Sequence, residues 1–182
     1  NLQDLAAYLG TFAVPAPVPT VDVVEFYNAA RDHYFVSGAP AEIADLDAGV
    51  HAGWARTGLS FKAHASAAAG VSPVCRFYIP PAKGNSHFYS SSASECDAIY
   101  DAAYNPANPA HGTYAGFIYE TGAAFHVDRT VDDTCPPTRV PVWRLWNKRV
   151  DTNHRYTTDL GIRSQMLAQG YVDEGIVMCA LP

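Results

Sequence analysis

The sequence has little charge and no excess of basic residues, and this restricts its partners. Only 16% of the 182 residues are charged, and the net charge is −6. Proteins that bind nucleic acid need a basic face that displaces counterions from the phosphates. The sequence also has no apolar run of the roughly 20 residues that a membrane-spanning helix requires. We therefore expect no nucleic-acid partner and no insertion into a membrane.

The common sequence signatures of catalysis and cofactor binding are absent as well. The sequence contains no GxSxG, HExxH or P-loop motif. It contains no CxxC pair, which excludes the usual zinc ribbon and the dithiol redox site. We therefore expect a chain that has no cofactor, no bound metal and no catalytic residues.

The four cysteines, Cys75, Cys96, Cys135 and Cys179, are widely spaced along the chain. An even number of cysteines without a metal-binding spacing is typical of two disulfides formed in an oxidising compartment. We expect Cys75 to bond with Cys179 and Cys96 with Cys135, while the two other connectivities remain open. Four buried free thiols in a cytosolic protein are the alternative. The predicted location is thus secreted or periplasmic.

Apolar and aromatic residues are plentiful. Hydrophobic residues make up 48% of the chain, which contains eleven Tyr, eight Phe and three Trp. This composition supplies a core, favours β-sheet and provides rings on which ligands can stack. The length corresponds to one large domain, or to one domain and a fragment of another.

One pattern occurs three times, in units at about residues 21–65, 74–131 and 140–182. Each unit begins with an aromatic strand, a polar turn and a return strand, and a short helix and a turn glycine follow. Because one unit alone is too small to bury a core, the three are expected to pack around a pseudo-threefold axis. The predicted fold is mainly β with one short helix in each repeat, arranged as a three-bladed, propeller-like domain. A β-trefoil is the alternative.

Residues 1–20 precede these units and differ from them in composition. Residues 1–12, NLQDLAAYLGTF, are expected to form a helix, and the VPAPVPT segment after it a semi-rigid linker. The helix resembles the last helix of a class I cytochrome c domain. This resemblance implies a further domain upstream in the same chain. The sequence has no CxxCH haem-attachment motif, so no haem is expected.

Residues 21–182 share a specific pattern: an aromatic residue, Tyr or Trp and Asn, then a polar turn, His-Phe/Tyr-Tyr-Thr/Ser, a helix and a Glu-Gly pair. The pattern resembles a secreted repeat domain, usually described as of unknown function, that is commonly appended to exported bacterial and fungal proteins, hydrolases among them. The resemblance implies a lectin-like accessory module rather than a catalyst. The first unit departs from the pattern with Thr57 before Gly58, and the second with Ile79 in place of Asn.

The third hairpin is the main candidate for a ligand site. It combines an indole, amides, a carboxylate, an imidazole and a guanidinium within ten residues, and saccharides bind to aromatic rings that polar groups surround. The expected ligand-binding residues are Trp146, Asn147, Asp151, Asn153, His154 and Arg155. The weaker candidates are Tyr27, Asn28, Asp32 and His33 in the first unit and His87 in the second. We therefore predict a non-catalytic module that binds a glycan or polysaccharide.

Three other interpretations remain open. His33, His87 and His154 are taken as equivalent positions, which could tie the hairpins to the backbone, line a ligand pocket or converge on a zinc ion. Glu120 and Glu174 could form a catalytic acid pair, although their shared place in the pattern favours a structural role. The domain could also be a structural cap without a ligand.

Overall fold

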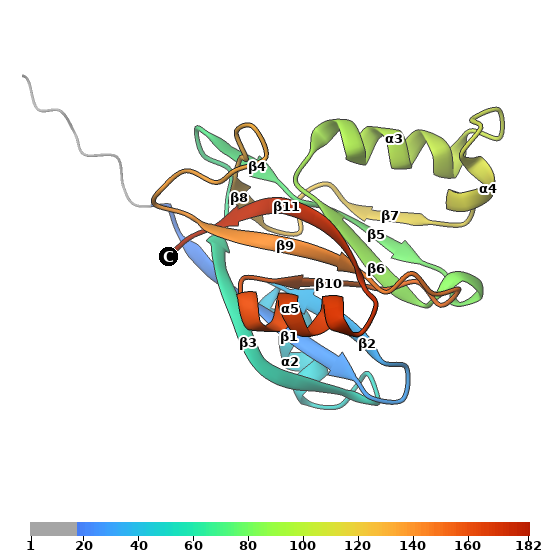
Figure 1. Cartoon of the computed structure of the whole chain (residues 1–182), viewed down its shortest axis with the longest axis horizontal. Helices are drawn as coiled ribbons and strands as arrows, with labels where there is room; N and C mark the ends of the chain where they lie inside the picture. The colour runs from blue at the N-terminus through green and yellow to red at the C-terminus, as the bar shows by residue number, and fades with distance from the viewer. Residues whose placement is uncertain (1–17) are drawn as a thin grey trace, which may run out of the picture.

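A hairpin, a short helix and a return strand follow one another three times along the chain (Figure 1). The structure, a computed structural model, describes residues 18–182. The predicted helix over residues 1–12 and most of the Pro-rich linker lie outside the described residues. The first unit consists of β1 (Thr20–Asn28), β2 (His33–Ser37), α2 (Pro40–Asp47) and β3 (Trp54–His64).

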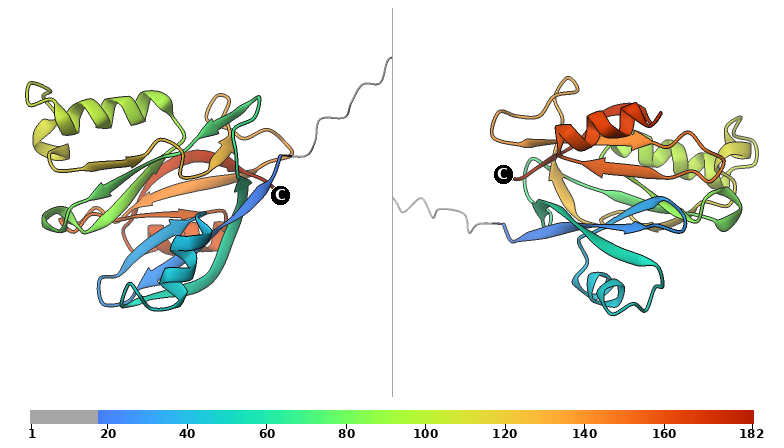
Figure 2. Two further views of the ribbon diagram at one scale, coloured as in Figure 1. Left: turned by 180° about the vertical axis from the view of Figure 1, so that it is seen from behind. Right: turned by 60° about the horizontal axis from the view of Figure 1, so that its bottom comes forward.

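The second unit contains two additional short helical segments. Its elements are β5 (Cys75–Ile79), η1 (Pro81–Lys83), β6 (Ser86–Ser90), α3 (Ala93–Tyr104), α4 (His111–Tyr114) and β7 (Ile118–Thr121). The third unit consists of β9 (Val140–Trp146), β10 (His154–Thr157), α5 (Leu160–Ala168) and β11 (Val172–Ala180). The short strands β4 (Val71–Pro73) and β8 (His126–Asp128) lie between units in the sequence. Helices α2, α3 and α5 lie on the outside of the molecule, each beside strands of its own unit (Figure 2).

In every unit the first strand of the hairpin lies between the second strand and the return strand. The second unit forms a separate antiparallel sheet with the order β6-β5-β7. The first and third units belong to one larger sheet, β10-β9-β11-β8-β3-β1-β2, because β8 pairs with both return strands. Neither sheet closes into a barrel. The prediction of a mainly β chain is confirmed. One short helix in each unit is found in the first and third units, whereas the second contains η1, α3 and α4.

The return strands are longer than the sequence indicated. In the first unit the expected turn glycine, Gly58, does not lie in a turn, because β3 continues through it as one strand. The chain makes a β-bulge at this point, where the pairing register of β1 with β3 shifts between Val24 and Phe26. Gly58 has φ +87° and Gly175 in β11 has φ +83°, a backbone region that favours glycine. Each glycine therefore bends a strand instead of ending it.

The second strands of the three hairpins meet in the interior of the molecule. The Tyr89 hydroxyl donates to the carbonyl of Val36 at 2.6 Å. The Tyr156 hydroxyl donates to the carbonyl of Tyr89 at 3.0 Å and accepts from its N–H at 2.8 Å. Both tyrosines are buried. These hydrogen bonds connect the second unit to the first and the third unit to the second.

The helix starts follow the sequence signals. The Ser92 hydroxyl accepts a hydrogen bond from the N–H of Glu95 at 3.3 Å, and the Asp159 carboxylate accepts from the N–H of Ile162 at 3.0 Å. These contacts satisfy helix N–H groups that have no partner within the helix. Among residues 18–182, no helix is long and apolar enough to cross a membrane.

The prediction of two disulfides is confirmed, but the predicted pairing is wrong. The bonds join Cys75 to Cys96 and Cys135 to Cys179. Helix α3 packs back on the hairpin of its own unit, so Cys96 in its first turn lies over Cys75 at the start of β5. Cys135 precedes the third unit and lies beside Cys179 near the end of β11. Two disulfides indicate an oxidising compartment.

Candidate functional site

The strand pairing shows which residues of the three hairpins are equivalent. Ser37, Ser90 and Thr157 each accept a hydrogen bond from the N–H two residues further on, at the same turn before the helix. Three residues earlier in each second strand, Tyr34, His87 and His154 pair with Tyr27, Tyr78 and Trp146 respectively. The predicted equivalence of His33 with His87 and His154 is therefore wrong by one residue.

Arg144 of β9 connects two carboxylates at the boundary between the second and third units. Its guanidinium donates to both oxygens of Glu95 in α3, at 2.8 and 3.0 Å, and its Nε donates to Glu174 of β11 at 2.7 Å. The guanidinium carbon lies 4.5 Å from the centre of the Phe88 ring. The Arg144 side chain is only 7% exposed. The fold thus brings together one arginine and two carboxylates from two units.

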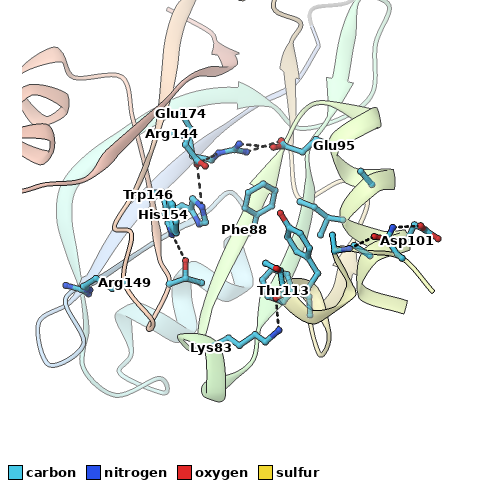
Figure 3. Close-up of a pocket in the computed structure, with 18 of the residues that line it drawn as sticks. Lys83, Phe88, Glu95, Asp101, Thr113, Arg144, Trp146, Arg149, His154 and Glu174 are labelled. Carbon is cyan, nitrogen blue, oxygen red and sulfur yellow. Dashed lines mark hydrogen bonds and ion pairs between the residues drawn. The ribbon is translucent and has the colours of Figure 1, made fainter. Parts of the chain in front are cut away.

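A cavity of about 780 Å³ opens beside this cluster (Figure 3). We call it the Trp146 cavity. It lies between the second and third units and is lined by Lys83, Phe88, Glu95, Asp101, Tyr114, Phe117, Arg144, Trp146, Arg149, His154 and Glu174, among others. A volume of a few hundred Å³ and a mainly apolar wall with a few polar groups are typical of small-molecule sites.

The indole of Trp146 is held in a fixed orientation at the cavity wall. Its Nε1 donates to the Thr152 hydroxyl at 2.7 Å. The equivalent aromatic residues are held in the same way, because the Tyr78 hydroxyl is hydrogen-bonded to the side-chain amide of Asn85 at 2.6 Å and the Tyr27 hydroxyl donates to Asp32 at 2.9 Å. In each hairpin the loop therefore fixes the polar end of the ring. The rest of the ring can form a rigid surface.

The protonation states at the Trp146 cavity follow from burial and from Arg144. Burial, with the charge of Arg144, lowers the pKa of His154 to about 3, so its imidazole is neutral at physiological pH. Burial raises the pKa of Glu174, although Arg144 opposes this. Burial acts on Glu95 in the same direction, but the hydrogen bonds and charge of Arg144 outweigh it and the pKa is lowered. The cavity thus presents a neutral imidazole and two carboxyl groups that differ in acidity.

Stability should fall as the pH is lowered through the range in which His154 titrates in the unfolded chain. In the unfolded chain the imidazole has a pKa of about 6.5 and is protonated below that pH. In the folded protein it stays neutral until the pH falls to about 3. We expect a loss of about 2 kcal/mol in the free energy of unfolding between pH 7.5 and 5. Glu174, whose pKa is raised, offsets part of the loss at the lower end of this range.

Urea unfolding across this pH range measures the effect. His154→Gln should flatten the dependence, whereas His51→Gln, at an exposed position, should leave it unchanged. A dependence that His154→Gln leaves as steep as in the parent protein would contradict the assignment. His33, whose pKa burial also lowers, accounts for the slope expected to remain in that variant.

The structure places only part of the predicted third-unit site at the cavity. Trp146 and His154 line it. Asn153 is buried and bonds both the N–H and the carbonyl of Tyr34 through its amide, at 2.8 and 2.9 Å. Asn147 is buried too and donates to the carbonyl of Asp151 at 3.0 Å. The two asparagines therefore shape the hairpin loop and its contact with the first unit.

Arg155 and Asp151 lie apart from the cavity. Arg155 is buried and donates to both oxygens of Glu25 in β1, at 2.8 and 2.9 Å. Its guanidinium stacks on Tyr34, with the guanidinium carbon 3.9 Å from the ring centre. The Asp151 carboxylate is exposed and pairs with Arg149 at 3.1 Å. The six predicted residues therefore do not share one open face.

The weaker predicted site of the first unit is used for contacts between hairpin loops. His33 is buried, and its Nε2 lies 3.1 Å from the carbonyl of Asp151. Asp32 pairs with Arg149 at 2.6 Å, and the Asn28 side chain accepts from the N–H of Arg31 at 3.3 Å. Tyr27 packs against Tyr34 with ring centres 4.8 Å apart. His33 and Asp32 therefore connect the first unit to the third, whereas Asn28 and Tyr27 contact residues of their own unit.

Sequence reasoning missed Arg144, Glu95 and Phe88. None of the three was among the expected ligand-binding residues. The signal was nevertheless present, because an arginine occurs at the same strand position in the second and third units, Arg76 and Arg144. A glutamate likewise occurs at the same helix position in the first and second units, Glu42 and Glu95. Their pairing between units could not be derived from one unit alone.

The positions of the potential metal ligands and of the two glutamates bear on the remaining interpretations, a shared zinc ion and a catalytic acid pair. Within residues 18–182, no three His, Cys, Asp or Glu side chains are grouped as a metal ion would require. Glu120 lies at the boundary between the first and second units, where it pairs with Arg76, and Glu174 lies at the next boundary. Glu120 and Glu174 thus line two different cavities.

Comparison with known proteins gives a family but no function. The family model described as a domain of unknown function, DUF5648, matches residues 9–114 and again residues 110–181. No curated protein and no solved structure matches the chain significantly. The chemistry of the Trp146 cavity has to be derived from its own residues.

Proposed function

The chain belongs to this family of domains of unknown function, and on that premise we propose that it is a non-catalytic carbohydrate-binding module whose site is the Trp146 cavity. The observation that carries the proposal is the position of Trp146 and Phe88 in the same cavity as Glu95 and Glu174. Aromatic rings bind the apolar C–H faces of a sugar, and carboxylates accept hydrogen bonds from its hydroxyls.

Arg144 prepares these carboxylates for hydroxyl recognition. It holds Glu95 and Glu174 through three charge-assisted hydrogen bonds, so neither has to be ordered when a ligand arrives. A carboxylate accepts about four hydrogen bonds, and Arg144 uses at most two of these positions on either group. The remaining acceptor positions of a fixed carboxylate cost little entropy to use, because they are preorganised.

The charges of the cavity favour a neutral sugar over an anionic one. Each cation at its wall already has partners on the protein. Lys83 donates to the carbonyls of Gly112 and Thr113 at 3.0 and 2.6 Å, and Arg149 pairs with Asp32 and Asp151. Since the chain carries a net charge of −6, uronic acids and sulfated sugars should be repelled. The proposed ligand is an oligosaccharide of neutral hexoses.

Glycoside hydrolysis is a second candidate, favoured by one observation. Glu95 has a lowered pKa and Glu174 a raised one, and two carboxyl groups of different acidity in one cavity are the arrangement of a glycosidase. The same two groups are, however, bound to one arginine, which limits the movement of either toward a glycosidic bond. The pairing with Arg144 therefore supports binding rather than hydrolysis.

The broader setting of the module is part of the proposal. The three units, each with its first strand between two neighbours, support a three-bladed, propeller-like arrangement with pseudo-threefold symmetry, in which β8 fuses two blades. The two disulfides support a secreted protein. In that setting the module would bring an attached domain to a polysaccharide.

Replacement of Trp146 by alanine should weaken binding of a neutral hexasaccharide about tenfold. A solvated sugar that gains about 4–5.5 kcal/mol binds with a dissociation constant of about 0.1–1 mM, and the loss of one stacking ring removes about 1.4 kcal/mol of it. The measurement is isothermal titration with cellohexaose, maltohexaose and mannohexaose. Trp143→Ala is the matched control, because Trp143 packs beside Arg163 and does not line the cavity.

Two results of the titration would count against the proposal. Equal affinities for the parent and the Trp146→Ala variant would place binding elsewhere. Release of new reducing ends during incubation with the same sugars, abolished by Glu174→Gln, would favour the hydrolase. The parent protein is expected to leave the sugars intact.

A further inference from the structure

A second arginine-centred cluster lies at the boundary between the first and second units. Arg76 of β5 donates to both oxygens of Glu42 in α2, at 2.9 and 3.1 Å. Its Nε lies 2.7 Å from Glu120 of β7, and His87 lies 3.3 Å from the same carboxylate. This is the same relation of helix, hairpin and return strand that Glu95, Arg144, His154 and Glu174 show one unit later.

A cavity of about 620 Å³ adjoins the Arg76 cluster. We call it the Trp54 cavity. Phe35, Trp54 and Tyr78 form its aromatic wall, and Glu42, His87 and Glu120 also line it. The Phe35 ring packs against Trp54 and His87, with ring centres 5.8 and 4.8 Å apart. A fixed aromatic surface and two arginine-bound carboxylates therefore occur together again.

The two cavities correspond residue by residue. In the paired hairpin strands, Phe35 corresponds to Phe88, Tyr78 to Trp146, His87 to His154 and Arg76 to Arg144. Glu42 and Glu95 take the same position in the first turn of α2 and α3. At the return strands, the register gives Trp54 the place of Phe117 and Glu120 the place of Glu174. Each position keeps its chemical character, since aromatic residues replace aromatic residues and carboxylates replace carboxylates. A core that only had to be filled would not need the same polar set at two boundaries.

The third boundary, between the third and first units, lacks this set of aromatic residues, arginine and carboxylates. Glu25 stands at the arginine position, and Arg155 stands where the other units have Phe35 and Phe88. Their buried ion pair, the Tyr34 ring stacked on Arg155, and an apolar cluster with Ile162, Met166 and Tyr171 occupy this boundary. A helix glutamate is replaced by Ile162, so no pair of carboxylates remains.

We infer that the Trp54 cavity is a second binding site for the same neutral oligosaccharide, so that the domain is bivalent and not trivalent. This inference rests on the proposed function of the Trp146 cavity. Two sites of weak affinity on one rigid domain suit a polysaccharide chain, because binding at one site raises the effective concentration at the other.

Tryptophan fluorine NMR tests the two sites separately. The chain has three tryptophans, of which Trp146 and Trp54 each line one cavity and Trp143 lines neither. The protein labelled with 5-fluorotryptophan is titrated with cellohexaose, maltohexaose and mannohexaose. With at least one of them, the Trp146 and Trp54 signals should both shift and saturate, while the Trp143 signal stays in place. Tyr78→Ala should abolish the shift of Trp54 and leave that of Trp146.

Each of the other outcomes would contradict the second site, the assignment of the Trp146 cavity, or both. A saturating shift of Trp146 alone would overturn the second site and leave the proposed function standing. A shift of Trp54 alone would support the second site and overturn the assignment of the Trp146 cavity. No shift with any of the three sugars would overturn both, and equal shifts of all three signals would show binding outside the cavities.

Discussion

Replacement of Arg155 by methionine is expected to lower the free energy of unfolding by about 3–5 kcal/mol, the usual cost of breaking a buried ion pair from one side. The Arg155 and Glu25 side chains are only 6% and 4% exposed. Loss of the guanidinium leaves the Glu25 carboxylate buried without its two hydrogen bonds and removes the cation that stacks on Tyr34. At the boundary between the third and first units, removing the Arg155 charge without that of Glu25 is therefore strongly destabilising.

A double-mutant cycle in urea measures this coupling. Glu25→Leu combined with Arg155→Met should cost much less than the sum of the two single changes, because no buried charge is left unpaired. Arg56→Met is the matched control, since the Arg56 pair with Asp47 is 48% and 40% exposed and water screens such a pair, so its loss should change stability little. A loss below about 1 kcal/mol for Arg155→Met would show that this boundary is not held by the ion pair.

Removal of the disulfide between Cys135 and Cys179 should have an effect of similar size. In the chain-entropy model, cross-linking residues 44 apart stabilises by about 4 kcal/mol, and the 21-residue separation of Cys75 and Cys96 by about 3 kcal/mol. The two variants, each with one cysteine pair replaced by alanine, should therefore differ by less than about 1 kcal/mol in free energy of unfolding, measured in urea. The variant without Cys135 and Cys179 should be the less stable.

The two variants should also separate in binding. The Cys75–Cys96 bond anchors the first turn of α3, which carries Glu95. Its loss should weaken sugar binding in addition to stability, whereas loss of the Cys135–Cys179 bond should change stability alone. Equal binding losses in both folded variants would mean that the bond to α3 has no special part in positioning Glu95.

Local elements could be predicted from the sequence because local signals determine them. The Ser92 and Asp159 caps, the aromatic strands and the repeated order of elements all depend on residues a few positions apart. Even so, His33 was misaligned by one position, because the hairpins were aligned by their histidines, and the first unit has Tyr34 where the others have His87 and His154. Alignment by the serine or threonine that ends each second strand gives the correct register.

The candidate site could be predicted only in part, through Trp146 and His154, because most of it lies between units. Arg144 and Glu95 are 49 residues apart, and their contact depends on how α3 sits against the next hairpin. For the same reason the sequence did not show that Arg155 faces Glu25 and not a ligand. The predicted disulfide pairing was wrong for the same reason, because the spacing of the cysteines does not show that α3 packs on its own hairpin. Interfaces between repeats are nonlocal and need the folded structure.

The most direct test of the account is a crystal structure of the protein soaked with the hexasaccharide that shifts the Trp146 signal. We expect a hexose ring stacked on the Trp146 indole, with its hydroxyl groups bonded to Glu95 and Glu174 and with Arg144 still bridging both carboxylates. An empty Trp146 cavity, with the sugar bound on the outer strand face near Trp143, would contradict it.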